Sequence, residues 1–346
     1  MAKLQLIITA DYEIFGNGSG CADHCMIAPT ERMMKLAEAQ GGSICLFVDV
    51  CEYWAFQQAY GSGQLAEDEA AKIEQQLKDA VRRGHDVQLH FHPQWLDAQF
   101  ENGKWHLNEA YWRLPEVERL AGWSLEKLFR EGKATLESML RPVDPNYACD
   151  VFRAGAWCIQ PEEEVLRVMK NLGFRIESTV APGKIYFDGR TVYDFTQAPN
   201  LPFWKISGQV TQDDPEGTIT EYPIFTTHIP GWQVFRFNLI KAMRNIPQKP
   251  VGCEAVSDSR YTKSFIDKFF GSFEGQVKML NNSDGVSFQE MQFITKKAIR
   301  RYRNHPGNVP LVMIGHPKTF GNDREFERYL AWITTLQDVK FGNYKN

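Results

Sequence analysis

The sequence places acidic and imidazole side chains two residues apart, next to apolar runs that are typical of buried strands. Asp11 and Glu13 follow the first such run, and His90 and His92 lie at the end of a later one. Residues two apart on extended backbone point to the same side, so each pair is expected to face one pocket. Two carboxylates in one pocket repel each other and stay ionised together only near a cation. Carboxylate and imidazole ligands suit Zn²⁺ or a similar divalent ion that keeps a position open for water.

Each of these motifs also has a purely structural interpretation. A single acid after a strand often caps a helix or pairs with an arginine, and an isolated His-x-His pair is more often hydrogen-bonded within the core. We favour the metal site, with Glu13, His90 and His92 as ligands, because the two motifs occur together in one chain.

Further polar residues close other apolar runs. Arg153 ends one run, Asp49 ends another, and His316 follows the last in a Gly-His-Pro segment. An arginine that points at acidic groups pairs with one and orients it, although a surface ion pair is the alternative for Arg153. A neutral histidine can donate a proton to a leaving group. For Asp49 two roles stay open, which are contact with a substrate and support of Arg153.

Strand and helix patterns alternate along most of the chain. Strands are predicted at 4–10, 43–50, 86–91, 147–153, 174–178, 218–225 and 309–315, and helices at 29–40, 66–83, 124–140, 161–172, 288–302 and 324–336. This alternation predicts parallel strands joined by right-handed crossovers, and therefore an α/β fold of the distorted, TIM-like (β/α)7 barrel type. The carboxyl ends of barrel strands share one mouth, where the polar residues above would meet. The stretches 94–122, 179–217 and 245–286 are predicted to be long, ordered loops.

The composition is that of an ordinary globular chain, with 346 residues, 43% hydrophobic and 24% charged, and a net charge of −4. We expect a single domain over residues 1–346. No run of like charges indicates nucleic acid or an anionic membrane as partner, and the short apolar start predicts neither a signal peptide nor a membrane span. Seven scattered cysteines without a Cys-x-x-Cys pair favour a reducing, cytoplasmic compartment. The oligomeric state stays open.

The ordered motifs together resemble the polysaccharide deacetylases, also called NodB-homology proteins or carbohydrate esterase family four. Residues 9–13 (TADYE) are similar to the first family motif, 84–90 (GHDVQLH) to the opening of the second, and 152–157 (FRAGAW) to the third. His316 matches the histidine of the last motif. The resemblance spans about residues 3 to 320 and looks nearest to the WbmS-like branch.

This resemblance implies a metal-dependent hydrolase that removes an acetyl group from an N-acetylated sugar or glycan precursor. Asp11 would be the general base, Arg153 would hold Asp11, and His316 would be the general acid, while a metal-activated water attacks the acetyl carbonyl. The tryptophans expected near the mouth would stack on a sugar ring, although loop packing explains them equally well; they are Trp95, Trp112 and Trp157. A cytoplasmic enzyme would act on a nucleotide-linked or lipid-linked sugar.

The sequence departs from the family pattern at three places. Gln94 stands where the usual second metal histidine lies, so His92 is the predicted replacement. The third motif lacks its proline and tyrosine, and Glu13 lies one position beyond the usual acid. Two alternatives therefore stay open. One is a glycoside hydrolase, which would use paired carboxylates but has no need of three histidines, and the other is a non-catalytic barrel that binds carbohydrate.

Overall fold

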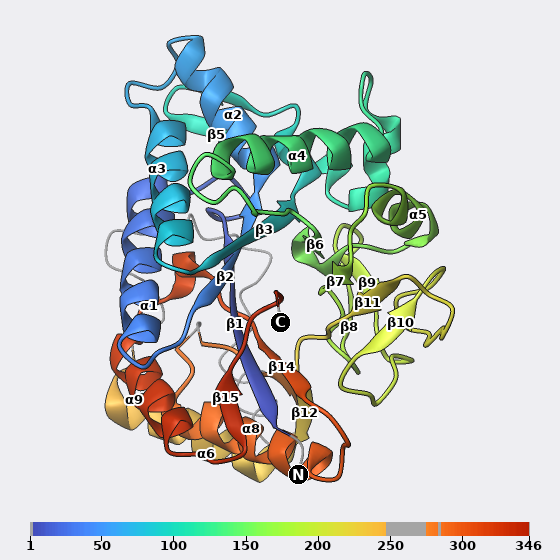
Figure 1. Ribbon diagram of the computed structural model, residues 1–346. Coiled ribbons are helices and arrows are strands. Elements are labelled where there is room, and N and C mark those ends of the chain that lie inside the picture. The colour runs from blue at the N-terminus through green and yellow to red at the C-terminus, as the bar shows by residue number, and fades with distance from the viewer. Residues whose placement is uncertain (1–2, 247–274, 283–284, 346) are drawn as a thin grey trace.

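The computed structural model describes residues 3–246, 275–282 and 285–345. A nine-stranded sheet forms its centre, in the order β10-β11-β7-β6-β3-β2-β1-β14, with β15 paired to β1. From β11 to β14 every neighbouring pair is parallel, whereas β10 is antiparallel to β11. The sheet curls into a half-barrel with helices around its outside (Figure 1). The predicted α/β fold with a parallel, barrel-type sheet is confirmed.

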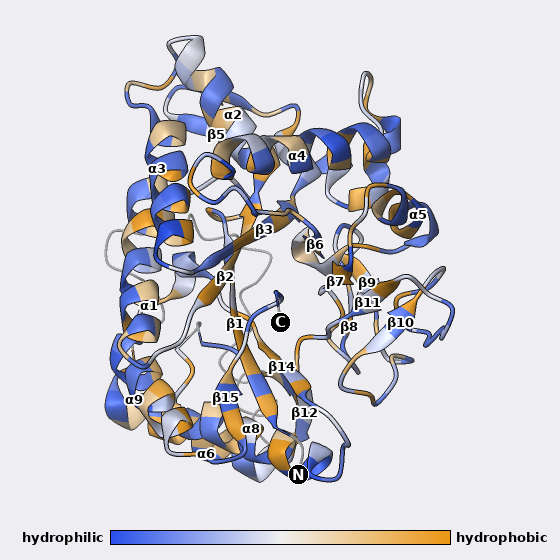
Figure 2. Ribbon diagram, viewed as in Figure 1, coloured by the Kyte–Doolittle hydropathy of each residue, from blue (hydrophilic) through white to orange (hydrophobic). Residues whose placement is uncertain are grey.

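Each of the predicted strands is present. The sheet contains β1 (Leu4–Tyr12), β2 (Ile44–Asp49), β3 (Asp86–Phe91), β6 (Val151–Ala154), β7 (Ile176–Glu177), β10 (Trp204–Ile206), β11 (Ile219–Glu221), β14 (Val309–Met313) and β15 (Val339–Phe341). Almost every residue of β1, β2 and β3 is buried, as expected of parallel strands that are covered on both faces. Apolar residues accordingly run along these strands, whereas α3 and α4 carry polar and apolar residues together (Figure 2).

The predicted helices are also present. They are α1 (Ala28–Glu38), α3 (Glu69–Arg82), α4 (Leu125–Leu140), α5 (Glu163–Asn171), α8 (Phe288–Tyr302) and α9 (Asp323–Thr334). The side chain of Ser124 accepts a hydrogen bond from Lys127 N at 3.1 Å, which caps α4 at its N-terminus. No helix within the described ranges has the length and apolar character that crossing a membrane requires.

Within the described residues, two α-helices were not predicted from the sequence, α2 (Val50–Gly61) and α6 (Gly231–Arg244). Val50 was assigned to the preceding strand, but Asp49 ends that strand and caps α2 by accepting from Cys51 N at 3.1 Å. The first two turns of α2, from Val50 to Phe56, are almost entirely buried, so the sequence has no clear polar face there to mark it as a helix.

The strand predicted at 147–153 begins only at Val151. The side-chain oxygen of Gln88 accepts hydrogen bonds from Asp150 N and Val151 N at 3.1 and 3.0 Å. A side chain therefore takes the place of a neighbouring strand there, and the regular ladder of β6 starts later.

The stretches predicted as loops contain short hairpins and helical turns. The hairpins are β4 (Gln99–Glu101) with β5 (Lys104–His106) and β8 (Ile185–Phe187) with β9 (Val192–Asp194). β12 (Thr226–Ile229), outside the predicted loops, pairs antiparallel with β13 (Gln276–Met279), which lies within the third predicted loop. The first predicted loop contains the turns η3 (Glu109–Tyr111) and η4 (Leu114–Arg119), and η2 (Pro93–Trp95) lies at its start. Three other turns of the described chain lie outside the predicted loops: η1 (Asp23–Ile27), η5 (Gly155–Trp157) and η7 (Pro317–Thr319). Most of the predicted loop 245–286 lies outside the described residues.

Phe91 anchors the end of β3 against α4. A Cβ atom on Gly132 would lie 2.7 Å from the Phe91 ring and 3.1 Å from Leu89 Cδ1. Gly132 therefore lets the helix approach the segment that carries both histidines of the His-x-His motif.

We predict that Gly132→Ala lowers the free energy of unfolding by about 1–3 kcal/mol through overpacking, although alanine is intrinsically the better helix former by roughly 0.5–1 kcal/mol. Denaturant unfolding checks this. Glu131→Ala, an exposed neighbour, serves as control and should change stability by less than about 0.5 kcal/mol. Equal stability of the Gly132→Ala variant and the wild type would contradict the close packing.

Candidate functional site

The ends of β1 and β3 bring three potential metal ligands together. Glu13, His90 and His92 each provide a ligand atom, and these atoms lie within 4.8 Å of one another in a buried group. Glu13 Oε2 is 2.6 Å from His92 Nε2 and 3.4 Å from His90 Nε2. Within the described part of the chain, neither Nε2 atom has a partner in hydrogen-bond geometry. This holds for His92 Nε2 even though it lies close to Glu13 Oε2. Two buried imidazole nitrogens therefore face a carboxylate oxygen without a good hydrogen bond, an arrangement that a cation between them would satisfy.

The outer nitrogen of His90 defines the tautomer of that ring. His90 Nδ1 lies 2.8 Å from the carbonyl oxygen of Arg153, which can only accept a hydrogen bond. Nδ1 therefore carries a proton, and the ring in its neutral form would present the lone pair of Nε2 to the group. A metal-binding histidine usually has this kind of outer partner.

Gln94 is the outer partner of His92. Its amide Nε2 lies 3.1 Å from His92 Nδ1, while its buried Oε1 has no hydrogen-bond partner among the described residues. Rotating the amide by 180° would let Oε1 accept from Nδ1–H, and it would leave the Nε2 lone pair of His92 free for a metal. Gln94 thus contacts His92 and does not itself belong to the potential metal-binding group, whereas His92 does.

Glu13 has a second charged partner that sequence reasoning did not identify. Lys318 Nζ donates to Glu13 Oε1 at 2.6 Å and to the carbonyl oxygen of Ile14 at 2.9 Å. Burial alone would raise the pKa of Glu13, but the charges of His92 and Lys318 hold it well below its usual value. The sequence signal was the residue's position two places after His316, at the end of a barrel strand.

Asp11 is held by Arg153 and faces His316. Arg153 is fully buried, and its Nη1 donates to Asp11 Oδ1 at 2.6 Å and to Thr9 Oγ1 at 2.9 Å. His316 Nε2 lies 3.4 Å from the other carboxylate oxygen, Oδ2. Burial would raise the pKa of Asp11, but Arg153, with smaller contributions from His316 and His90, holds it well below its usual value. The structure thus contains the predicted contact between Arg153 and Asp11, and the catalytic roles of these residues stay predictions.

A cavity of about 190 Å³ opens over these groups. Its lining includes both acids, His92 and His316, as well as Lys318, Trp112 and Trp157. Trp95, by contrast, is buried and packs against Phe56 and Trp105, so the structure places it in the core and not in the cavity wall. Of the predicted aromatic contacts, Trp112 and Trp157 are the ones in position to touch a ligand.

Asp49 supports the site from behind. Its Oδ1 accepts from the backbone N–H groups of Cys51 and His92, both at 3.1 Å, so it joins the start of α2 to the end of β3. Burial raises its pKa to about 7, where the charge of His92 opposes the shift and that of Glu13 adds to it. Asp49 is bonded to backbone amides, whereas the guanidinium of Arg153 donates to Ser178, Thr9 and Asp11. Of the two roles left open for Asp49, support of Arg153 is therefore replaced by support of the His92 backbone, and contact with a substrate stays a prediction.

The third motif forms the turn η5 in the cavity wall. Ala156 and Trp157 have φ values of 50° and 57°, a left-handed conformation that costs about 1–3 kcal/mol for residues other than glycine. A Cβ atom on Gly155 would lie 2.3 Å from the Phe91 carbonyl oxygen and 2.8 Å from the His92 ring. Glycine therefore allows this turn to pack directly against His92, one of the three potential metal ligands.

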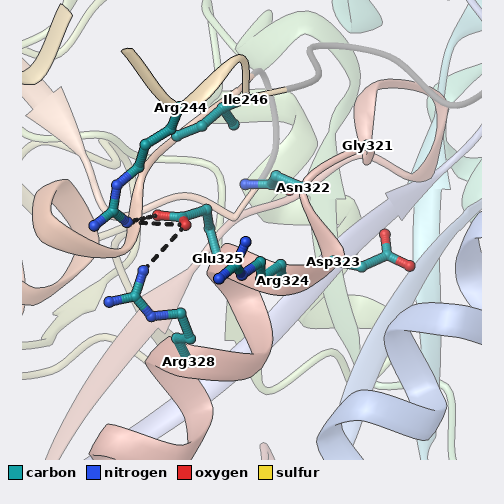
Figure 3. Close-up of a pocket in the computed structure, with 8 residues that line it drawn as sticks. All are labelled: Arg244, Ile246, Gly321, Asn322, Asp323, Arg324, Glu325 and Arg328. Carbon is teal, nitrogen blue, oxygen red and sulfur yellow. Dashed lines mark hydrogen bonds and ion pairs between the residues drawn. The ribbon is translucent and has the colours of Figure 1, made fainter. Parts of the chain in front are cut away.

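A larger pocket, of about 690 Å³, lies between the end of α6 and the start of α9 (Figure 3). Two of its arginines, Arg244 and Arg328, are bonded to the carboxylate of Glu325 at 3.1 and 3.3 Å. The charged groups of this pocket thus include an ion-paired cluster, and no predicted site residue lies there.

No family model and no curated protein matches the sequence. Solved structures do resemble it in fold. One described as a polysaccharide deacetylase from Mycobacterium smegmatis has 11% identity and a TM-score of 0.49, over 99% of this chain and 88% of that chain. Puue allantoinase has 12% identity and a TM-score of 0.47, over 99% and 88%. A 4-alpha-glucanotransferase from Thermococcus litoralis has 10% identity and a TM-score of 0.49, over 100% of this chain and 40% of that chain.

The structures that this chain resembles include polysaccharide deacetylases and an allantoinase. With TM-scores below 0.5, none of them assigns an activity to the chain. None tests the WbmS-like branch, which stays a prediction.

We predict that Gln94→Leu lowers the affinity for a divalent ion by about 10- to 100-fold, because His92 loses its outer partner. Titration of chelator-treated protein with Zn²⁺ measures this. Gln58→Leu, at an exposed position of α2, is the matched control and should bind as the wild type does. An unchanged affinity in Gln94→Leu would show that the amide has no role in orienting His92.

Proposed function

We propose that the protein is a divalent-metal-dependent hydrolase that removes an acetyl group from an N-acetylated sugar or glycan precursor. The observation that carries this proposal is the buried group of Glu13, His90 and His92 beside a second acid, Asp11, and a cavity-facing His316. The fold resemblance to polysaccharide deacetylases agrees with it.

The donor atoms suit zinc or a similar ion. One carboxylate oxygen and two imidazole nitrogens are the ligands of many catalytic zinc sites, which keep a fourth position open. Once bound, such an ion supplies Lewis-acid chemistry, since it polarises a carbonyl oxygen and lowers the pKa of a water to about 7. Glu13 is ionised and both Nε2 atoms are oriented toward it, so these residues fit the ion.

Asp11 is the proposed general base. It is ionised because Arg153 lowers its pKa, and the same guanidinium fixes one of its oxygens, leaving Oδ2 on the side of His316. In this position Asp11 takes the proton of the attacking water. A backbone N–H of the Gly155–Trp157 turn is the proposed donor to the developing oxyanion.

His316 is the proposed general acid. Its side chain is 20% exposed and lines the cavity, so a leaving amine in the cavity can reach it. Protonation of that amine by an imidazolium completes the cleavage of the C–N bond.

The cavity indicates how the substrate binds. At about 190 Å³ it is smaller than the roughly 300–1,000 Å³ of pockets that enclose a whole drug-sized ligand. It would therefore receive the acetylated end of a sugar between Trp112 and Trp157, while a nucleotide or lipid carrier stays outside. The carrier and the cytoplasmic compartment remain part of the proposal.

The glycoside hydrolase alternative is less well supported by the site. That chemistry needs one carboxylic acid to be protonated near neutral pH. Here the pKa values of both acids that line the cavity, Asp11 and Glu13, lie well below their usual values. Asp49, whose pKa is raised to about 7, is bonded to backbone amides and is not part of the cavity lining.

We predict stoichiometric divalent metal in the purified protein and acetate release from N-acetylated nucleotide sugars. Asp11→Asn should keep the metal and lose about 10²- to 10⁴-fold in kcat, the usual contribution of a general base. His90→Ala should lose the metal, while the exposed control Glu327→Gln should retain metal and activity. Metal content by mass spectrometry and acetate by enzymatic assay check these outcomes.

The contrasting results separate the alternatives. Release of a reducing sugar without acetate would favour a glycoside hydrolase. A metal-free protein that binds sugar but turns over none of the substrates would favour a non-catalytic barrel.

A further inference from the structure

Lys318 lies in the turn that directly follows His316. The turn is η7 (Pro317–Thr319), which begins at the proline after His316. The Lys318 side chain is only 12% exposed, and it forms part of the cavity lining. Its two recorded acceptors are Glu13 Oε1 and the carbonyl oxygen of Ile14, so the ammonium group is directed at the metal-binding acid and not at solvent.

This contact divides the two oxygens of Glu13 between different partners. Oε1 is 2.6 Å from Lys318 Nζ, and Oε2 faces the two imidazole rings. A charge-assisted hydrogen bond of this length in a buried site is strong. Glu13 is therefore oriented with one oxygen toward the ligand group and with the other one occupied.

Two consequences follow for a divalent ion. First, a carboxylate with one oxygen occupied binds through the other oxygen alone, which keeps the coordination number low and suits a tetrahedral site. Second, the ammonium charge repels a dication, and this repulsion is strong where the surroundings are buried and poorly screened.

Lys318 also compensates Glu13 without a metal. An ionised carboxylate that is buried without a partner is strongly destabilising, and Glu13 is only 5% exposed. The cup formed by Glu13, His90 and His92 can therefore keep its folded geometry before an ion binds.

We propose that Lys318 is a positioning residue that restricts Glu13 to ligation through Oε2 and lowers the affinity of the site for divalent ions. This inference rests on the metal-dependent function proposed above. Lys318, which follows the Gly-His-Pro segment, would thus help to determine which ions bind and how tightly they bind.

The test is a titration of the chelator-treated, full-length protein with Co²⁺, followed by absorption spectroscopy. Co²⁺ replaces zinc in many sites, and its d–d bands are intense in four-coordinate sites and weak in five- or six-coordinate ones. The wild type should show the intense bands. Lys318→Met should bind Co²⁺ roughly ten-fold or more tightly because the repulsion is lost, with weaker bands as both oxygens of Glu13 become free to ligate.

Two further variants control the experiment. Lys318→Arg keeps the charge and should resemble the wild type, and Lys340→Met, at an exposed position, should change nothing. If Lys318→Met does not fold, Lys318→Gln takes its place, since it removes the charge but keeps a hydrogen-bond donor. Circular dichroism checks the fold of each variant.

The outcomes distinguish this inference from the proposed function. The inference is supported if Lys318→Met binds Co²⁺ and the wild type does not. It is also supported if Lys318→Met binds Co²⁺ more tightly than the wild type does and with altered d–d bands. Equal affinities and equal spectra in the wild type and Lys318→Met would overturn it while leaving the metal-dependent function intact. Failure of both proteins to bind Co²⁺ would overturn the inference together with the metal-dependent function.

Discussion

The site depends on the compensation of buried negative charge. Asp11 and Glu13 lie two residues apart at the end of β1, and each is almost fully buried. Both stay ionised because a cation contacts each of them, Arg153 at 2.6 Å from Asp11 and Lys318 at 2.6 Å from Glu13. Without these partners burial would favour the protonated acids, which could neither ligate a cation nor act as a base.

The parallel sheet is what allows this compensation. β1, β3, β6 and β14 each contribute at their carboxyl ends, so groups more than 300 positions apart in the chain meet in one cup. Close packing behind the cup holds the geometry. Phe91 fits against Gly132, and Gly155 lets the turn after β6 contact His92. Gly132 and Gly155 thus allow the close packing around the site, since a larger side chain at either position would collide with Phe91 or His92.

The features that recur along the sequence, strand and helix patterns in alternation and polar residues at strand ends, could be predicted. The alternating patterns predicted the strands, and the polar residues at their ends predicted that Arg153 pairs with an acid, which the family resemblance identified as Asp11. The α2 helix was missed because its sequence is apolar on nearly every side. Lys318 and Gln94 were given no role because their contacts depend on distances across the cup, 2.6 Å to Glu13 and 3.1 Å to His92, which no local pattern encodes. Trp95 looked like a mouth residue from its position, yet it packs into the core.

The central claim is that the cup made by Glu13, His90 and His92 binds a divalent ion. Diffraction from crystals soaked with Zn²⁺, recorded on either side of the zinc absorption edge, tests it most directly. The account predicts one strong anomalous peak about 2.0–2.2 Å from one Glu13 oxygen and from the Nε2 atoms of both histidines. A peak at another place, or none in the cup when the ion is in excess, would contradict it.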